Sequence, residues 1–244
     1  MDANGGHPIH SMFDRIKKAL ATSVKSSSAP GGASSQQQHG PMSEWAATQG
    51  FGFSVEGRAQ EVSLEGKVSG KPWRMQLGRP TRNYILGEEL RARAELGVRD
   101  DVAVLVMNKP LKEALEKKAY SIYTDPLQTS MDAELPEEMR WLAMFKEARW
   151  EGPSKDFWSR YSVLTDRREN AMAWIEPQLA MMMMDWPTPG PSAEVPFLIL
   201  LLRGKSYLRM EYSPAGMPTL RHASLIFQTS CKSALTNLGP QAKS

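Results

Sequence analysis

The chain has 244 residues, of which 41% are hydrophobic and 23% charged, and a formal net charge of +3 at pH 7. This is ordinary globular composition, and the length suffices for folding without disulfides or a structural metal. The single cysteine, Cys231, excludes an intrachain disulfide. The longest apolar run, residues 197–202, is far shorter than the about 20 residues of a membrane helix. With no secretory signal visible, we expect a cytoplasmic protein without a transmembrane segment.

The first 42 residues are predicted to be a tail outside the globular body. Residues 11–24 place apolar side chains at helical spacing and basic side chains at 15–18, which predicts a short amphipathic helix. Such a helix either docks onto a partner or an anionic membrane surface, or is a helix-prone segment that frays in water. Residues 25–41 are rich in Ser, Gly, Gln and Pro and are predicted to be a disordered linker.

The body is predicted to open with a helix over residues 43–49 and then a β-hairpin. Ser43 is suited to cap that helix. Residues 62–68 and 73–77 carry strand signals on either side of a Ser-Gly-Lys-Pro stretch at 69–72. Such a stretch is typical of a turn, so the two strands are expected to pair.

Two further strands and two helices are predicted in the middle of the chain. Apolar and charged residues alternate over 90–96, which favours a half-buried strand. Residues 102–107 are continuously apolar, which indicates a strand covered on both faces. Pro110 is suited to the first turn of a helix. A second helix is expected from Pro136, with Glu137 and Glu138 in its first turn and Lys146 and Arg149 in its last.

The C-terminal part is predicted to hold a hairpin and a long helix. Residues 197–202 and 206–212 are expected to pair around an Arg-Gly-Lys turn at 203–205. The final helix is expected over residues 219–238, with an apolar stripe that includes Cys231.

A near-duplicated hexapeptide divides the body. Tyr-Ser-Ile-Tyr-Thr-Asp at 120–125 recurs as Tyr-Ser-Val-Leu-Thr-Asp at 161–166, and each copy is predicted to begin as a strand. We therefore expect an α+β fold of mainly antiparallel hairpins with helices packed on one side, in pseudo-related lobes at 43–152 and 153–238. A single domain over 43–238 is the alternative.

No residue pattern indicates catalysis, a metal site or a cofactor. Cys231 falls on the apolar face of a predicted helix, where cysteine behaves as a small hydrophobe. His222 is too far along the same helix to serve as its base. Asp125 and Asp166 end predicted strands and are explained by capping. No CxxC, HExxH or glycine-rich phosphate motif is present. We expect no cofactor and no metal, and lean against an enzyme.

Two features are candidates for binding. The first is a stretch without acidic residues from Gly66 to Gly87, with interleaved aromatics, which could hold an anion or a nucleic acid. Its basic residues are Lys67, Lys71, Arg74, Arg79 and Arg82. The second is a methionine-rich helix predicted over 178–186, either sandwiched between lobes or partly exposed to a partner. Its candidate contacts are Met182, Met183 and Trp186.

The function favoured by the sequence is that of a non-enzymatic adaptor. It would contact a protein partner through the Met/Trp-rich helices and the tail helix. Binding of an anion, a nucleic acid or an anionic membrane surface through residues 67–82 and 15–18 is the first alternative. An enzyme whose site is assembled from residues distant in sequence is the second.

Overall fold

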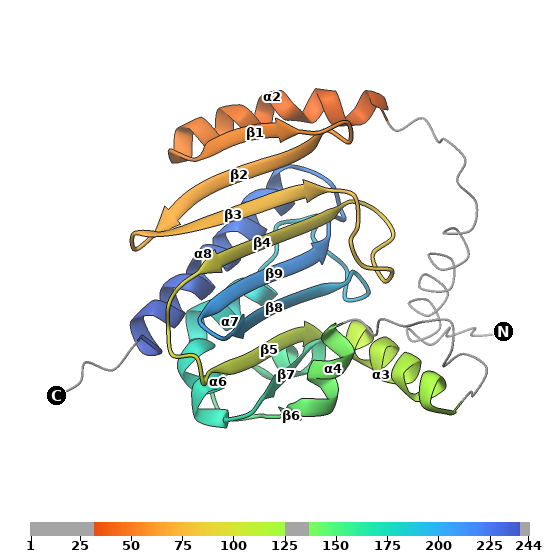
Figure 1. The fold of residues 1–244 in the computed structure, drawn as a ribbon, viewed down its shortest axis with the longest axis vertical. Coiled ribbons are helices and arrows are strands. Elements are labelled where there is room, and N and C mark those ends of the chain that lie inside the picture. The colour runs from red at the N-terminus through yellow and green to blue at the C-terminus, as the bar shows by residue number, and fades with distance from the viewer. Residues whose placement is uncertain (1–31, 125–136, 240–244) are drawn as a thin grey trace.

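The computed structural model describes residues 32–124 and 137–239. Nine antiparallel strands form one sheet in the order β1-β2-β3-β4-β9-β8-β5-β7-β6 (Figure 1). The strands are β1 (Gly52–Glu56), β2 (Glu61–Val68), β3 (Lys71–Gly78), β4 (Glu89–Glu95), β5 (Ala103–Asn108), β6 (Lys146–Glu147), β7 (Tyr161–Thr165), β8 (Phe197–Leu202) and β9 (Lys205–Glu211). The helices are α2 (Gly32–Gln49), α3 (Lys109–Thr124), α4 (Glu137–Met144), α5 (Lys155–Arg160), α6 (Arg168–Trp174), α7 (Pro177–Met184) and α8 (Met217–Asn237). The α+β class predicted from the sequence is confirmed.

The sheet separates two hydrophobic cores of unequal size. The main core lies between one face of the sheet and helices α2 and α5–α8, and α8 passes behind the strands in Figure 1. On the other face, α3 and α4 pack on β5, β7 and β8 to form a smaller core. Among the described residues, no helix is both long enough and apolar enough to cross a bilayer.

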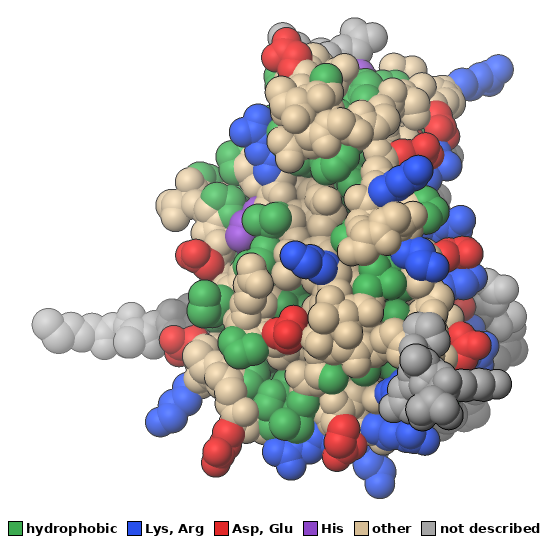
Figure 2. Space-filling view, turned by 90° about the vertical axis from the view of Figure 1, so that its left-hand side faces the viewer, with side chains coloured by type: hydrophobic (Ala, Val, Ile, Leu, Met, Phe, Trp, Pro, Cys, Tyr) green, Lys and Arg blue, Asp and Glu red, His purple; other side chains and the backbone are tan. Residues whose placement is uncertain are grey.

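Alternation along the strands decides which side chains reach the main core. In β4, Leu90, Ala92 and Ala94 are buried there, while Arg91 and Arg93 point to the opposite face. The continuously apolar strand β5 contributes to both cores and is covered on both faces, as predicted. On the second face, most side chains of β3, β4 and β9 beyond α4 are half-buried or exposed, while Glu89 and Glu211 at the strand ends are buried. This open face carries the charged residues seen along the right-hand margin of the side view (Figure 2).

Both predicted hairpins are present, with turns tighter than expected. Ser69 and Gly70 have φ of 48° and 79°, and Arg203 and Gly204 have φ of 49° and 72°. Two successive left-handed residues are the geometry of the type I′ turn, whose twist matches that of paired strands. Residues 71, 72 and 205 therefore belong to strands rather than to the turns.

The helix at the start of the body is longer than predicted. It begins at Gly32, so residues 32–41, expected to be linker, are helical. Met42, Trp45 and Ala46 are buried on one side of α2 against the main core. The packing of these residues stabilises the helical turns that they form. Adding residues 32–41 to an existing helix costs less free energy than nucleating a new helix. Composition alone does not reveal this long-range contact. The predicted tail helix at 11–24 lies outside the described residues.

The two copies of the hexapeptide have different structures. Residues 161–165 form strand β7, as predicted, but residues 120–124 are the last turn of α3. Strong helix formers run from Pro110 into the first copy without a breaker, whereas the second copy lies between β5 and β6 in the sheet. The expected lobes at 43–152 and 153–238 also share this sheet, because β5 pairs with both β7 and β8, and β4 with β9.

The helix predicted from Pro136 is shorter than expected. α4 ends at Met144, and Lys146 and Glu147 instead form the short edge strand β6 against β7. Lys146 and Arg149 therefore do not lie in its last turn. A ladder with β7 satisfies backbone groups that a longer helix would have satisfied internally.

Candidate functional site

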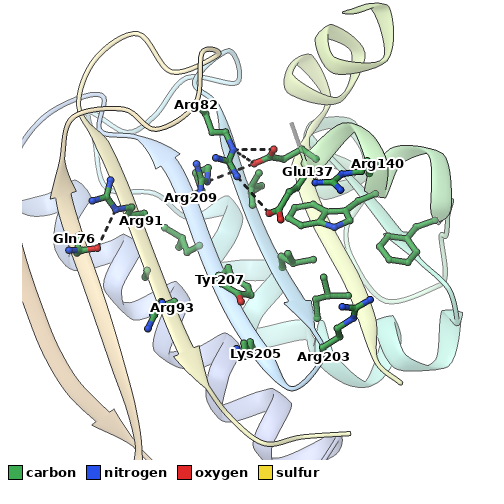
Figure 3. A pocket seen from close by; sticks show the side chains of 18 of the residues that line it. Gln76, Arg82, Arg91, Arg93, Glu137, Arg140, Arg203, Lys205, Tyr207 and Arg209 are labelled. Carbon is green, nitrogen blue, oxygen red and sulfur yellow. Dashed lines mark hydrogen bonds and ion pairs between the residues drawn. The ribbon is translucent and has the colours of Figure 1, made fainter. Parts of the chain in front are cut away.

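A groove lies on the open face of the sheet, between the strands and helix α4 (Figure 3). Its volume is about 660 Å³, within the range of small-ligand pockets. Eight of its lining residues are basic, and seven of these are arginines: Arg74, Arg82, Arg91, Arg93, Arg140, Arg203, Lys205 and Arg209. We name this feature the arginine groove. Strands β3, β4, β8 and β9 supply its floor, and α4 supplies one wall.

Strand register places arginines directly opposite arginines on this floor. Arg74 of β3 pairs in register with Arg93 of β4, and Arg91 of β4 pairs with Arg209 of β9. Like charges directly opposite in an antiparallel pair are destabilising. The fold therefore contains two adjacent cross-strand pairs whose charges repel one another.

Carboxylates at the edge of the groove neutralise some of these arginines. The ion pairs are Arg74–Glu56 at 2.7 Å, Arg91–Glu61 at 2.9 Å and Arg209–Glu89 at 2.8 Å. By contrast, the exposed side chains of Arg93, Arg140 and Arg203 have no acidic partner among the described residues. They lie on β4, on α4 and on the β8–β9 turn, so unpaired guanidinium groups border the groove on three sides.

A buried carboxylate attaches α4 to the sheet. Glu138 is 1% exposed, and it accepts hydrogen bonds from Arg82 Nε at 2.9 Å and from the Tyr84 hydroxyl at 3.0 Å. Arg209 Nε lies 3.9 Å from the same carboxylate. Burial and then the Glu138 charge raise the pKa of Tyr84 well above its ordinary value. Burial alone would lower the pKa of Arg82, but the charge and hydrogen bond of Glu138 outweigh burial, so the pKa of Arg82 is raised.

The part of the groove nearest α4 is apolar and aromatic. Leu198, Leu200 and Leu202 of β8 form its floor. Tyr207 of β9 and Trp141 of α4 are half-buried, and Met144 is 67% exposed. A ligand in the groove therefore meets guanidinium groups and a ring surface at once.

The basic residues predicted from the sequence divide between the groove and the outer surface. Arg74 and Arg82 line the groove, but each already has a carboxylate partner. Lys67 and Lys71 lie at the β2–β3 hairpin and Arg79 follows β3, all exposed and outside the groove lining. The other arginines of the groove come from strands and from α4, and the sequence reasoning missed them. Their only local signal was Arg91 and Arg93 on one face of an alternating strand.

The methionine-rich segment folds as α7 on the opposite face of the sheet. Met183 is fully buried in the main core, and Met182 and Trp186 are half-buried against it. The Met182 carbonyl oxygen lies 2.7 Å from His222 Nε2, which attaches α7 to α8. Of the four consecutive methionines, Met181 alone has a side chain classed as exposed, at 67%. These residues therefore share no site with the arginine groove.

Cys231 has the environment of a core residue. Its side chain is buried, and burial raises the pKa of the thiol to about 12. Such a thiol is a poor nucleophile at neutral pH. Within the ranges that the structure describes, no cluster of three His, Cys, Asp or Glu residues is arranged to hold a metal.

Comparison with known proteins yields one likeness at the level of structure. No family model matches the chain, and no curated protein matches it in sequence. The fold is similar to that of the mycobacterial trehalose monomycolate transport factor A, TtfA, with a TM-score of 0.45 and 9% sequence identity. The likeness covers 82% of this chain and 95% of TtfA.

Proposed function

We propose that this protein is a non-enzymatic binding protein that takes an anionic ligand in the arginine groove. The observation that supports the proposal is the register of the open face, where Arg74 opposes Arg93 and Arg91 opposes Arg209. In the first pair Arg93 has no acidic partner among the described residues, so the repulsion costs stability in the free protein, whereas Arg91 and Arg209 are each offset by a carboxylate. A bound phosphate or carboxylate would relieve the repulsion, because the planar guanidinium group forms paired hydrogen bonds with such anions.

The adaptor function favoured by the sequence has less support. Helix α7 uses Met183 and part of Met182 to fill the main core, so among its candidate methionines a partner would meet mainly Met181, with Met172 of α6 and Leu225 of α8 also exposed. The arginine groove is concave, with an apolar part and several arginines that have no acidic partner among the described residues, and concave sites that combine apolar surface with a few polar groups are typical of ligand binding.

Titration calorimetry of the full chain with inorganic tripolyphosphate at low salt tests the proposal. Arg93→Gln and Arg203→Gln should each weaken binding about 10- to 150-fold, because hydrogen bonds to charged groups contribute about 1.5–3 kcal/mol. Arg221→Gln is the matched control, since Arg221 is an exposed arginine of α8 on the opposite face. The proposal fails if the groove variants bind like the control, or if no binding is detected at low salt.

A further inference from the structure

The groove arginines that have no acidic partner within residues 32–124 and 137–239 lie close to aromatic rings. Arg93 lies in register with Tyr207 across the β4–β9 pair, so the two side chains are neighbours on the open face. On the opposite wall, Arg140 is followed in α4 by Trp141, which also lines the groove. Arg203 lies at the far end, on the β8–β9 turn (Figure 3). Charge and ring surface are thus combined within one cavity of about 660 Å³.

We propose that the occupant of the arginine groove is a segment of single-stranded nucleic acid. Its phosphates would contact Arg93, Arg140 and Arg203, and one of its bases would stack on Tyr207. This inference rests on the proposed function and names the chemical class of its ligand. Positive grooves with stacking rings are the recurring device by which proteins hold single strands without sequence preference.

The predominance of arginine over lysine fits this ligand. The groove has seven arginines and one lysine. A guanidinium group can form two parallel hydrogen bonds with a phosphate and can also stack on a base, whereas an ammonium group acts as a point charge. An array of arginines beside Tyr207 therefore suits a ligand that alternates phosphates with planar rings.

The shape and composition of the groove disfavour other anions. A duplex keeps its bases stacked inside, so it would leave Tyr207 without a partner. A flat anionic bilayer would reach the exposed Met144 and the exposed arginines, but it would leave the half-buried ring of Tyr207 without a stacking partner. An acidic peptide supplies carboxylates but needs no ring surface beside them.

Fluorescence anisotropy of the full chain with an end-labelled oligodeoxythymidylate of about 12 nucleotides tests the inference. Three phosphate contacts predict that log K falls with log[salt] with a slope of about −2. Tyr207→Leu should weaken binding about 5- to 150-fold, since base stacking contributes about 1–3 kcal/mol. Tyr207→Phe keeps the ring and should bind like the unaltered chain, and so should Arg221→Gln.

The competing occupants give distinct results. If ADP or polyglutamate displaces the oligonucleotide at an equal concentration of charge, or if Tyr207→Leu binds it as well as Tyr207→Phe does, the inference is wrong. Tight binding to phosphatidylserine vesicles with no binding of the oligonucleotide would also overturn it. Tripolyphosphate binding separates the two proposals: if it depends on Arg93 while the oligonucleotide does not bind, only the nucleic-acid assignment fails.

Discussion

Glu138 is the single residue whose replacement should most disturb the wall of the groove. Its carboxylate is 1% exposed and is shared by Arg82 and the Tyr84 hydroxyl, with Arg209 close by. Glu138→Gln preserves shape but removes the negative charge. Breaking a buried ion pair on one side typically costs about 3–5 kcal/mol. Arg82 is 25% exposed and Arg209 keeps Glu89, so we expect the lower end, about 3 kcal/mol.

Urea unfolding of the full chain measures this cost. The midpoint should fall with an unchanged slope, because the same surface is exposed on unfolding. Glu137→Gln is the matched control: its side chain is 57% exposed and lies 3.8 Å from Arg82. An exposed pair of this kind contributes about 0–1 kcal/mol. If Glu138→Gln costs no more than Glu137→Gln, the carboxylate does not hold α4 to the sheet in the way described.

Three further predictions concern stability and reactivity. Arg93→Gln should raise the free energy of unfolding by about 0.2–1 kcal/mol while weakening anion binding, and a lowered urea midpoint would contradict the repulsion argument. Gly66→Ala should cost about 1–3 kcal/mol, since a Cβ there would lie 2.6 Å from the buried Trp73 ring; a midpoint unchanged from the wild type would refute it. The pKa of the Cys231 thiol is about 12 in the folded chain, so the thiol ionises at lower pH in the unfolded chain than in the folded chain. Its contribution to stability is therefore full below about pH 9 and lost as pH rises toward 12, and Cys231→Ala should flatten the alkaline loss measured by urea titration.

The strands were predictable because their signals are local. Alternation over 90–96 and the apolar run over 102–107 each correspond to a strand within one residue at either end. Gly70 and Gly204 marked the two turns, since a left-handed turn position favours glycine. In the hexapeptide the same reasoning failed, because an identical local pattern took the structure of its surroundings, a helix in one copy and a strand in the other.

The arginine groove could not be predicted in the same way. Its basic residues come from β3, β4, β9, α4, the loop after β3 and the β8–β9 turn, which are far apart in the sequence. Only strand order and register bring Arg209 beside Arg91, and no local pattern specifies a pairing between β4 and β9. The sequence also does not show which basic residues have acidic partners. Arg74 and Arg82 lie in a stretch without acidic residues, yet each forms an ion pair with a glutamate from another part of the chain.

The distribution of acids in the sheet separates arginines that have a carboxylate partner from arginines that have none among the described residues. At the end of the groove near β1, Glu56 and Glu61 form ion pairs with arginines of β3 and β4. At the α4 end, Glu138 pairs with an arginine of the loop after β3. Arg93 stands next to these pairs and has no carboxylate partner among the described residues. Exchanging Arg93 for Glu would place a third carboxylate near Arg74, which already pairs with Glu56 and Glu65, and should stabilise the sheet slightly more than Arg93→Gln does. Since an acid at this position would favour stability, the anion that we propose to bind in the groove would account for the arginine found there.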